Sequence, residues 1–133
     1  MDARLRVLVR QRARDQCEYC GLRQGHLPVL RFPIDHIRPK KHGGSDDPIN
    51  LALACNSCNL HKGANLTGID PESGHLEPLF HPRDDIWETH FERQGALIVG
   101  RTPIGRTTVQ VLDMNDPENV HLRIKLIALG QLG

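Results

Sequence analysis

Apolar residues near the start of the chain follow a helical pattern. Leu5, Leu8, Val9 and Ala13 fall in the i, i+3, i+4 order over residues 3–15, which is typical of an amphipathic helix. The arginines between them are expected on its outer face. This helix would lead directly into the first pair of cysteines.

Two short apolar runs then predict strands. Residues 29–37 are apolar and β-branched, although Pro33 cannot donate a ladder hydrogen bond and so favours an edge position or a bulge. Residues 51–54 form the second run. The segment 40–48 between them is dense in Gly, Ser, Asp and Pro and predicts a loop.

A helix is expected directly after the second strand. Asn56 or Ser57 can cap it, it runs to about Lys62, and Gly63 ends it. The predicted order over residues 1–66 is therefore helix, cysteine turn, strand, loop, strand and helix.

The second half of the chain carries weaker patterns. Turn formers predict a connector at about 67–80, so we expect a first domain at 1–66 and a C-terminal extension at 67–133 packed on it. Within the extension we expect a helix from Asp84 or Asp85 through Phe91, a hairpin of strands 96–99 and 107–112, and a last helix opened by Asp116-Pro117 and closed by Gly130. In that helix Val120, Ile124, Ile127 and Ala128 are spaced to pack on one face.

Charge is distributed unevenly along the chain. The 133 residues carry a formal net charge of +1, but residues 1–63 hold 11 Lys and Arg against 6 Asp and Glu, whereas residues 64–133 hold 6 against 10. A basic half suits an anionic partner such as nucleic acid, and it equally suits a solvated helix face. No run approaches the roughly 18 apolar residues of a membrane span, and no export signal is visible, so we expect a cytoplasmic protein without membrane contact. The oligomeric state stays open.

The four cysteines form two Cys-x-x-Cys pairs, Cys17/Cys20 and Cys55/Cys58. Four thiolates are a complete tetrahedral ligand set for a structural Zn²⁺. Such a site would stabilise a chain with only 4% aromatic residues. Two disulfides are the alternative, which an oxidising compartment would favour; a redox role for one pair leaves the other unexplained.

Polar residues of chemical interest lie between and just after the cysteine pairs. Asp35-His36-Ile37, Gly43-Gly44, Asn50-Leu51, Cys55-Asn56-Ser57-Cys58-Asn59 and Lys62-Gly63 occur in this order. Over about residues 14–65 the sequence resembles the zinc-stapled branch of the HNH endonucleases. This resemblance implies an α+β fold with a ββα-metal core, a four-cysteine zinc site and DNA as substrate.

The same residue types suit phosphodiester hydrolysis. Hydrolysis needs a base to activate water and a cation to stabilise charge on the phosphoryl group. We expect His36 as general base. Asp35 and Asn59 offer the oxygen ligands that Mg²⁺ or Mn²⁺ prefers. Adjacent strand residues point to opposite faces, so Asp35 and His36 reach one site only if the strand breaks there.

The helix after the second cysteine pair supplies further candidates. Asn59 and Lys62 share a face because they are three residues apart, whereas His61 points elsewhere; His61 is therefore the reserve metal ligand. The resemblance implies that Asn50 holds the loop and orients His36 through a hydrogen bond. Arg38, Lys40, Lys41 and Lys62 are the expected contacts to the nucleic-acid backbone.

Two functions remain in competition at this point. The first is a metal-dependent HNH endonuclease that hydrolyses DNA. The second is a catalytically inactive, zinc-stabilised module that binds nucleic acid or protein, which would need the cysteines but not Asp35 and His36.

Overall fold

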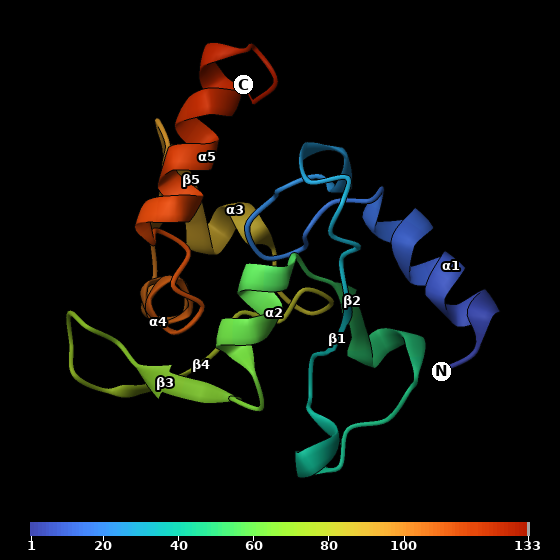
Figure 1. The fold of residues 1–133 in the computed structure, drawn as a ribbon. Coiled ribbons are helices and arrows are strands. Elements are labelled where there is room, and N and C mark those ends of the chain that lie inside the picture. Colours follow the sequence, from blue (N-terminus) through green and yellow to red (C-terminus); the bar gives the residue numbers. More distant parts are fainter. Residues whose placement is uncertain (133) are drawn as a thin grey trace.

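The chain adopts a mixed α/β fold with small sheets, as expected. The computed structural model describes residues 1–132, and in that part the strands pair as three separate two-stranded antiparallel sheets (Figure 1). The helices are α1 (Ala3–Ala13), α2 (Asn56–Lys62), α3 (Trp87–His90), α4 (Pro103–Val111) and α5 (Pro117–Ala128). The strands are β1 (Ile34–His36), β2 (Leu51–Leu53), β3 (Thr67–Ile69), β4 (Leu76–Pro78), β5 (Phe91–Gln94) and β6 (Leu97–Gly100).

Helix α1 forms where the apolar spacing predicts it. The Asp2 side chain caps it by accepting hydrogen bonds from the backbone N–H groups of Arg4 and Leu5, and Val9 is fully buried. The arginines are not all turned outward. Arg10 donates to the carbonyl of Phe32, and Arg12 to the carbonyls of Pro48 and Leu51, so they anchor the helix to the first hairpin.

The first hairpin is shorter than the sequence predicts. Strand β1 pairs with β2 in the register Ile34↔Leu53, Asp35↔Ala52 and His36↔Leu51, but residues 29–33 are not in the strand. The Gln24 side chain bonds the backbone of Leu27, Leu30 and Phe32. These local bonds satisfy backbone groups that a longer ladder would otherwise use.

The expected connector contains a second hairpin. Strands β3 and β4 pair antiparallel, with Gly68 opposite Glu77. Gly68 lies against α4, where an added Cβ would meet the side chains of Val111 and Thr107. Turn residues therefore marked a hairpin rather than a structureless link.

The third hairpin and helix α4 replace the hairpin expected at 96–99 and 107–112. Strands β5 and β6 pair with each other, and residues 103–111 are helical. The Thr102 side chain accepts a hydrogen bond from the N–H of Gly105, and Pro103 occupies the first helical position. This start signal outweighs the β-branched character of Thr107 and Thr108, both fully buried.

Helix α5 begins at Pro117 behind the Asp116 cap, as expected. Its buried face is different from the predicted one, because Arg123 and Leu126 are buried while Ile124 is 53% exposed. The Arg123 guanidinium donates to the carbonyls of Ala96 and Met114. A buried arginine that satisfies backbone carbonyls is not visible in an apolar pattern.

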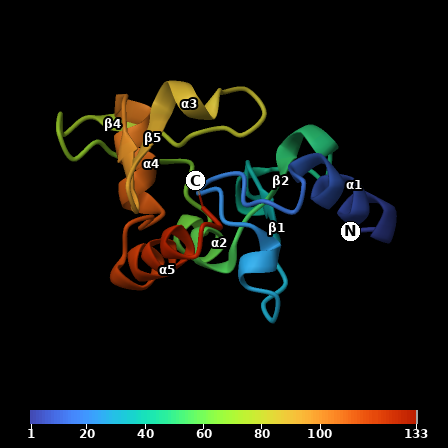
Figure 2. The same cartoon turned by 90° about the horizontal axis from the view of Figure 1, so that it is seen from above.

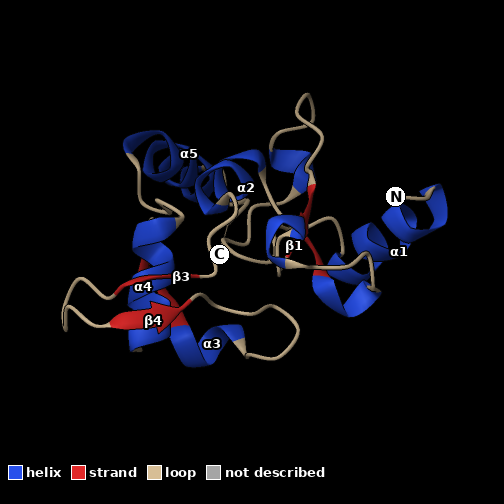
Figure 3. Ribbon diagram, turned by 90° about the horizontal axis from the view of Figure 1, so that it is seen from below, coloured by secondary structure: helices blue, strands red, loops and turns tan. Residues whose placement is uncertain are grey.

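Helix α2 lies at the centre of the molecule. It stands between α1 and the first hairpin on one side and α4 and α5 on the other (Figures 1 and 2), and the view from below shows β1 to one side of it and β3 and β4 to the other (Figure 3). The two halves meet through a hydrogen bond from Trp87 Nε1 to the Tyr19 carbonyl, 2.7 Å long, and an ion pair of Arg83 with Glu18. Among residues 1–132, no helix is long and apolar enough to cross a membrane.

Candidate functional site

The four cysteines come together in one cluster. The sulfur atoms of Cys17, Cys20, Cys55 and Cys58 all lie within 4.8 Å of one another, and the cysteines are free thiols. Sulfurs bound at ~2.3 Å to a tetrahedral zinc lie about 3.8 Å apart; the Sγ atoms of Cys20 and Cys55 are separated by 3.7 Å. The cluster is compatible with a structural zinc site.

Both cysteine pairs use the same local geometry. The N–H of Cys20 points at Sγ of Cys17, and the N–H of Cys58 at Sγ of Cys55, each at 3.4 Å. Cys55 is therefore the cap of α2, in place of the expected Asn56 or Ser57. Gly21 has φ of +83°, the left-handed conformation that its position after the first pair requires.

The four sulfurs interact closely with one another. Hydrogen bonds from Cys17, Cys20 and Cys58 lower the pKa of the Cys55 thiol, whereas hydrogen bonds with neighbouring sulfurs raise the pKa of Cys20 and of Cys58. Thiolate is the form that binds a metal ion, so a cation among the four sulfurs would favour deprotonation of all of them.

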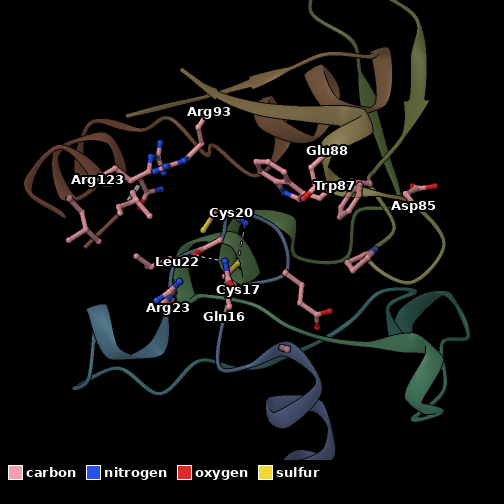
Figure 4. A pocket seen from close by; sticks show the side chains of 18 of the residues that line it. Gln16, Cys17, Cys20, Leu22, Arg23, Asp85, Trp87, Glu88, Arg93 and Arg123 are labelled. Atoms are coloured by element: carbon pink, nitrogen blue, oxygen red, sulfur yellow. Dashed lines mark hydrogen bonds between the residues drawn. The ribbon is translucent and has the colours of Figure 1, made fainter. Parts of the chain in front are cut away.

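A pocket of about 630 Å³ adjoins the cluster. Its walls come from both halves of the chain: Cys17 and Cys20 on one side, and Trp87 and Arg123 on the other (Figure 4). The pocket shows that the extension packs beside the first cysteine pair without closing over it.

Asp35 and His36 are the last two residues of β1, and their side chains have different partners. Asp35 is only 5% exposed. One of its oxygens accepts a hydrogen bond from the Tyr19 hydroxyl at 2.7 Å, and the other from Nζ of Lys62 at 3.2 Å. Burial raises the pKa of Asp35, and the Lys62 charge and the Tyr19 hydrogen bond oppose that rise.

Lys62 is buried rather than available to a phosphate. Only 1% of this residue is exposed, and Nζ also donates to the backbone carbonyls of His36 and Ile37 at 3.1 Å each. The end of this side chain thus reaches β1 instead of the solvent. Lys62 therefore fastens α2 to the first hairpin, and its expected role in DNA contact is corrected.

Lys62→Met should destabilise the zinc-loaded protein by roughly 3–5 kcal/mol near neutral pH, because it leaves the buried Asp35 carboxylate without its charge partner. The pKa of Asp35 should rise further in the variant. When folding raises the pKa of a carboxyl group, the folded protein loses stability as the pH increases from the pKa in the unfolded state to the pKa in the folded state. The deficit relative to wild type should therefore be smaller at pH 5.5 than at pH 8 in urea unfolding.

The matched control for this prediction is Lys41→Met, which removes an exposed lysine. It should change the free energy of unfolding by less than about 0.5 kcal/mol. Equal stability of Lys62→Met and wild type at pH 8 would contradict the ion-pair interpretation.

His36 is partly exposed and pairs with a carboxylate that the sequence analysis missed. Its Nε2 atom lies 2.7 Å from Oδ1 of Asp46, and the two side chains are 20% and 41% exposed. The hydrogen bond from His36 lowers the pKa of Asp46, and the charge of Lys40, 3.7 Å away, acts in the same direction. The only sequence signal was an acidic pair, Asp46-Asp47, in an otherwise basic loop.

Asn50 holds the loop through backbone atoms. Its Oδ1 accepts from the N–H of Arg38 at 2.8 Å, and its Nδ2 donates to the carbonyls of Arg38 and Ser45. The expected hydrogen bond from Asn50 to His36 is not the one observed, because the His36 ring pairs with the Asp46 carboxylate. Gly44 permits this closed loop, because an added Cβ would overlap the Arg38 carbonyl.

The remaining candidates separate into two groups. Asn59 is half-buried on α2, whereas His61 contacts Ser57 of the same helix and Asp113 of the C-terminal half. Arg38, Lys40 and Lys41 are exposed on the loop that follows His36.

Comparison with known proteins identifies part of the chain. A family model described as HNH endonuclease matches residues 17–65. This segment is an HNH domain. It contains both cysteine pairs, the β1–β2 hairpin and α2, and so includes every candidate catalytic residue. No curated protein and no solved structure matches the chain. The HNH domain supports a nuclease or a nucleic-acid-binding module.

Proposed function

We propose that the HNH domain hydrolyses phosphodiester bonds in DNA, with His36 as the general base. The observation that carries the proposal is the His36–Asp46 pair at the end of β1, inside the matched segment. A carboxylate can only accept a hydrogen bond, so Asp46 favours the tautomer with the proton on Nε2. Nδ1 then keeps its lone pair and can take a proton from water.

Mg²⁺ or Mn²⁺ would be held by Asp35 and Asn59, whose oxygen atoms are the ligand type these ions prefer. When bound, the ion would stabilise charge on the phosphoryl oxygens and the leaving group. Oδ2 of Asp35 accepts from Tyr19 and also lies 3.2 Å from Nζ of Lys62, whereas Oδ1 accepts one hydrogen bond, from Lys62. Oδ1 therefore keeps a lone pair for the ion, but Lys62 already neutralises this carboxylate. We therefore propose that the ion binds weakly until a substrate phosphate completes its coordination.

Exposed basic residues supply the proposed path for the DNA backbone. Arg38, Lys40 and Lys41 lie on the loop that begins directly after the hairpin strand carrying His36. Contacts of this kind position a duplex without reading its sequence. Lys40 also stands near Asp46, so a phosphate that approaches Lys40 approaches the His36–Asp46 pair.

The function is tested with supercoiled plasmid and the zinc-loaded full chain, in Mg²⁺, in Mn²⁺ and without added divalent ion. We expect conversion to open-circular or linear plasmid only when Mg²⁺ or Mn²⁺ is present. A protein that retains zinc and shifts DNA in a gel but leaves plasmid and RNA intact in both ions would instead be the inactive binding module.

A further inference from the structure

A second group of metal-ligating side chains lies outside the HNH candidate site. His61 of α2 meets Asp113 and Asp116, which lie in the turn between α4 and α5, and their ligand atoms all lie within 4.8 Å of one another. His61 occupies a different face of α2 from Asn59 and Lys62. The group therefore joins the HNH domain to the C-terminal half.

The His61 ring is oriented from behind by a backbone group. Nδ1 lies 2.8 Å from the carbonyl oxygen of Ser57, and since a carbonyl can only accept, Nδ1 carries a proton. In the neutral ring, Nε2 then presents its lone pair toward the two carboxylates. Metal-binding histidines have this arrangement, with the second ring N–H donated to a carbonyl or carboxylate.

The distances suit ligands of one ion better than a direct hydrogen bond. Nε2 of His61 and Oδ2 of Asp113 are 3.9 Å apart, which is too long for an N–H···O bond. Ligand atoms at about 2.0–2.2 Å from zinc can span such a separation. A lone pair facing two carboxylates is repulsive unless a metal ion or a proton lies among them.

The surrounding contacts hold the carboxylates in place. Asp116 caps α5 by accepting the N–H of Asn119 at 2.7 Å. The Asn119 amide donates to Oγ of Ser57 at 3.1 Å and lies 3.4 Å from the Asp113 carbonyl. One side chain thus bridges the residue that orients His61 and the turn that carries both aspartates.

We propose that His61, Asp113 and Asp116 form a second zinc site, which fastens the α4–α5 turn to α2. One imidazole and two carboxylates are ligands that Zn²⁺ accepts, and three protein ligands leave a position for water. This proposal does not depend on the proposed nuclease activity or on a catalytic ion.

The test is a calorimetric zinc titration of the full chain already loaded with one equivalent at the cysteines. Wild type should take up a second equivalent. His61→Gln and Asp113→Asn should lose it while they keep the first, and Asp116→Asn should bind it more weakly with the helix cap intact, because Asn also caps well. His121→Gln, which changes an exposed histidine of α5, is the matched control and should bind as wild type does.

Wild type that binds a single zinc, with His61 behaving as a simple ion-pair partner of Asp113, would overturn the proposal. A second equivalent that survives in both His61→Gln and Asp113→Asn would also overturn it, because the ion would then lie elsewhere. Elemental analysis of each variant verifies that the cysteine site stays filled.

Discussion

His36→Ala should lower the rate of plasmid cleavage by roughly 10²–10⁴-fold, the range that a positioned general base contributes. The variant should fold, because His36 is partly exposed and the backbone carbonyl that receives Lys62 is unchanged. Zinc content and the urea midpoint should therefore match wild type. The measurement is the initial rate of plasmid conversion at saturating Mg²⁺ or Mn²⁺.

His75→Ala is the matched control, since it removes an exposed histidine of the β3–β4 turn and should leave the rate unchanged. Asp46→Asn should lower the rate of plasmid cleavage by less than His36→Ala does. It keeps the shape of the side chain but removes the charge that orients His36, so a loss of about 10–100-fold is expected. Full activity of folded His36→Ala would assign the base to another residue.

Local start and stop signals account for what the sequence predicted well. The apolar spacing predicts α1, the Asp116-Pro117 pair starts α5, and the spacing of the cysteines brings four sulfurs together. Each of these features depends on a few neighbouring residues or on a known ligand geometry. They could therefore be read without tertiary contacts.

The same helix-start signals explain the largest difference between the fold expected from the sequence and the observed fold. Thr107 to Leu112 has the composition of a strand, but Thr102 and Pro103 begin a helix five residues earlier. The strand that pairs with 97–100 is instead 91–94. Pairing between strands depends on tertiary context more strongly than a cap does.

The sequence indicated the residue types of the candidate site, but not which of them are buried or which contact one another. Helical spacing predicted a shared face for Asn59 and Lys62, but it could not show that Lys62 is buried and pairs with Asp35. Asp46 was missed for the same reason, because its contact with His36 depends on how the loop of residues 37–50 closes. Burial and loop closure are properties of the packed chain.

Removal of zinc should unfold the HNH domain. The β1–β2 hairpin has three residues in each strand, so it cannot be stable alone. The cysteine cluster joins the turn after α1 to the start of α2 on either side of that hairpin. Zinc bound by four thiolates contributes about 10–16 kcal/mol, which equals or exceeds the roughly 5–15 kcal/mol stability of a typical domain.

The expected result is loss of far-ultraviolet circular dichroism from α1 and α2 when a strong chelator strips the protein, and recovery when Zn²⁺ but not Mg²⁺ is returned. A reductant alone should have no effect, because the cysteines are free thiols. Cys55→Ser should reproduce the unfolded state, since it removes a metal ligand, whereas the serine hydroxyl can still cap α2. Retention of the fold in chelator combined with its loss in reductant would instead indicate that two disulfides hold the domain together.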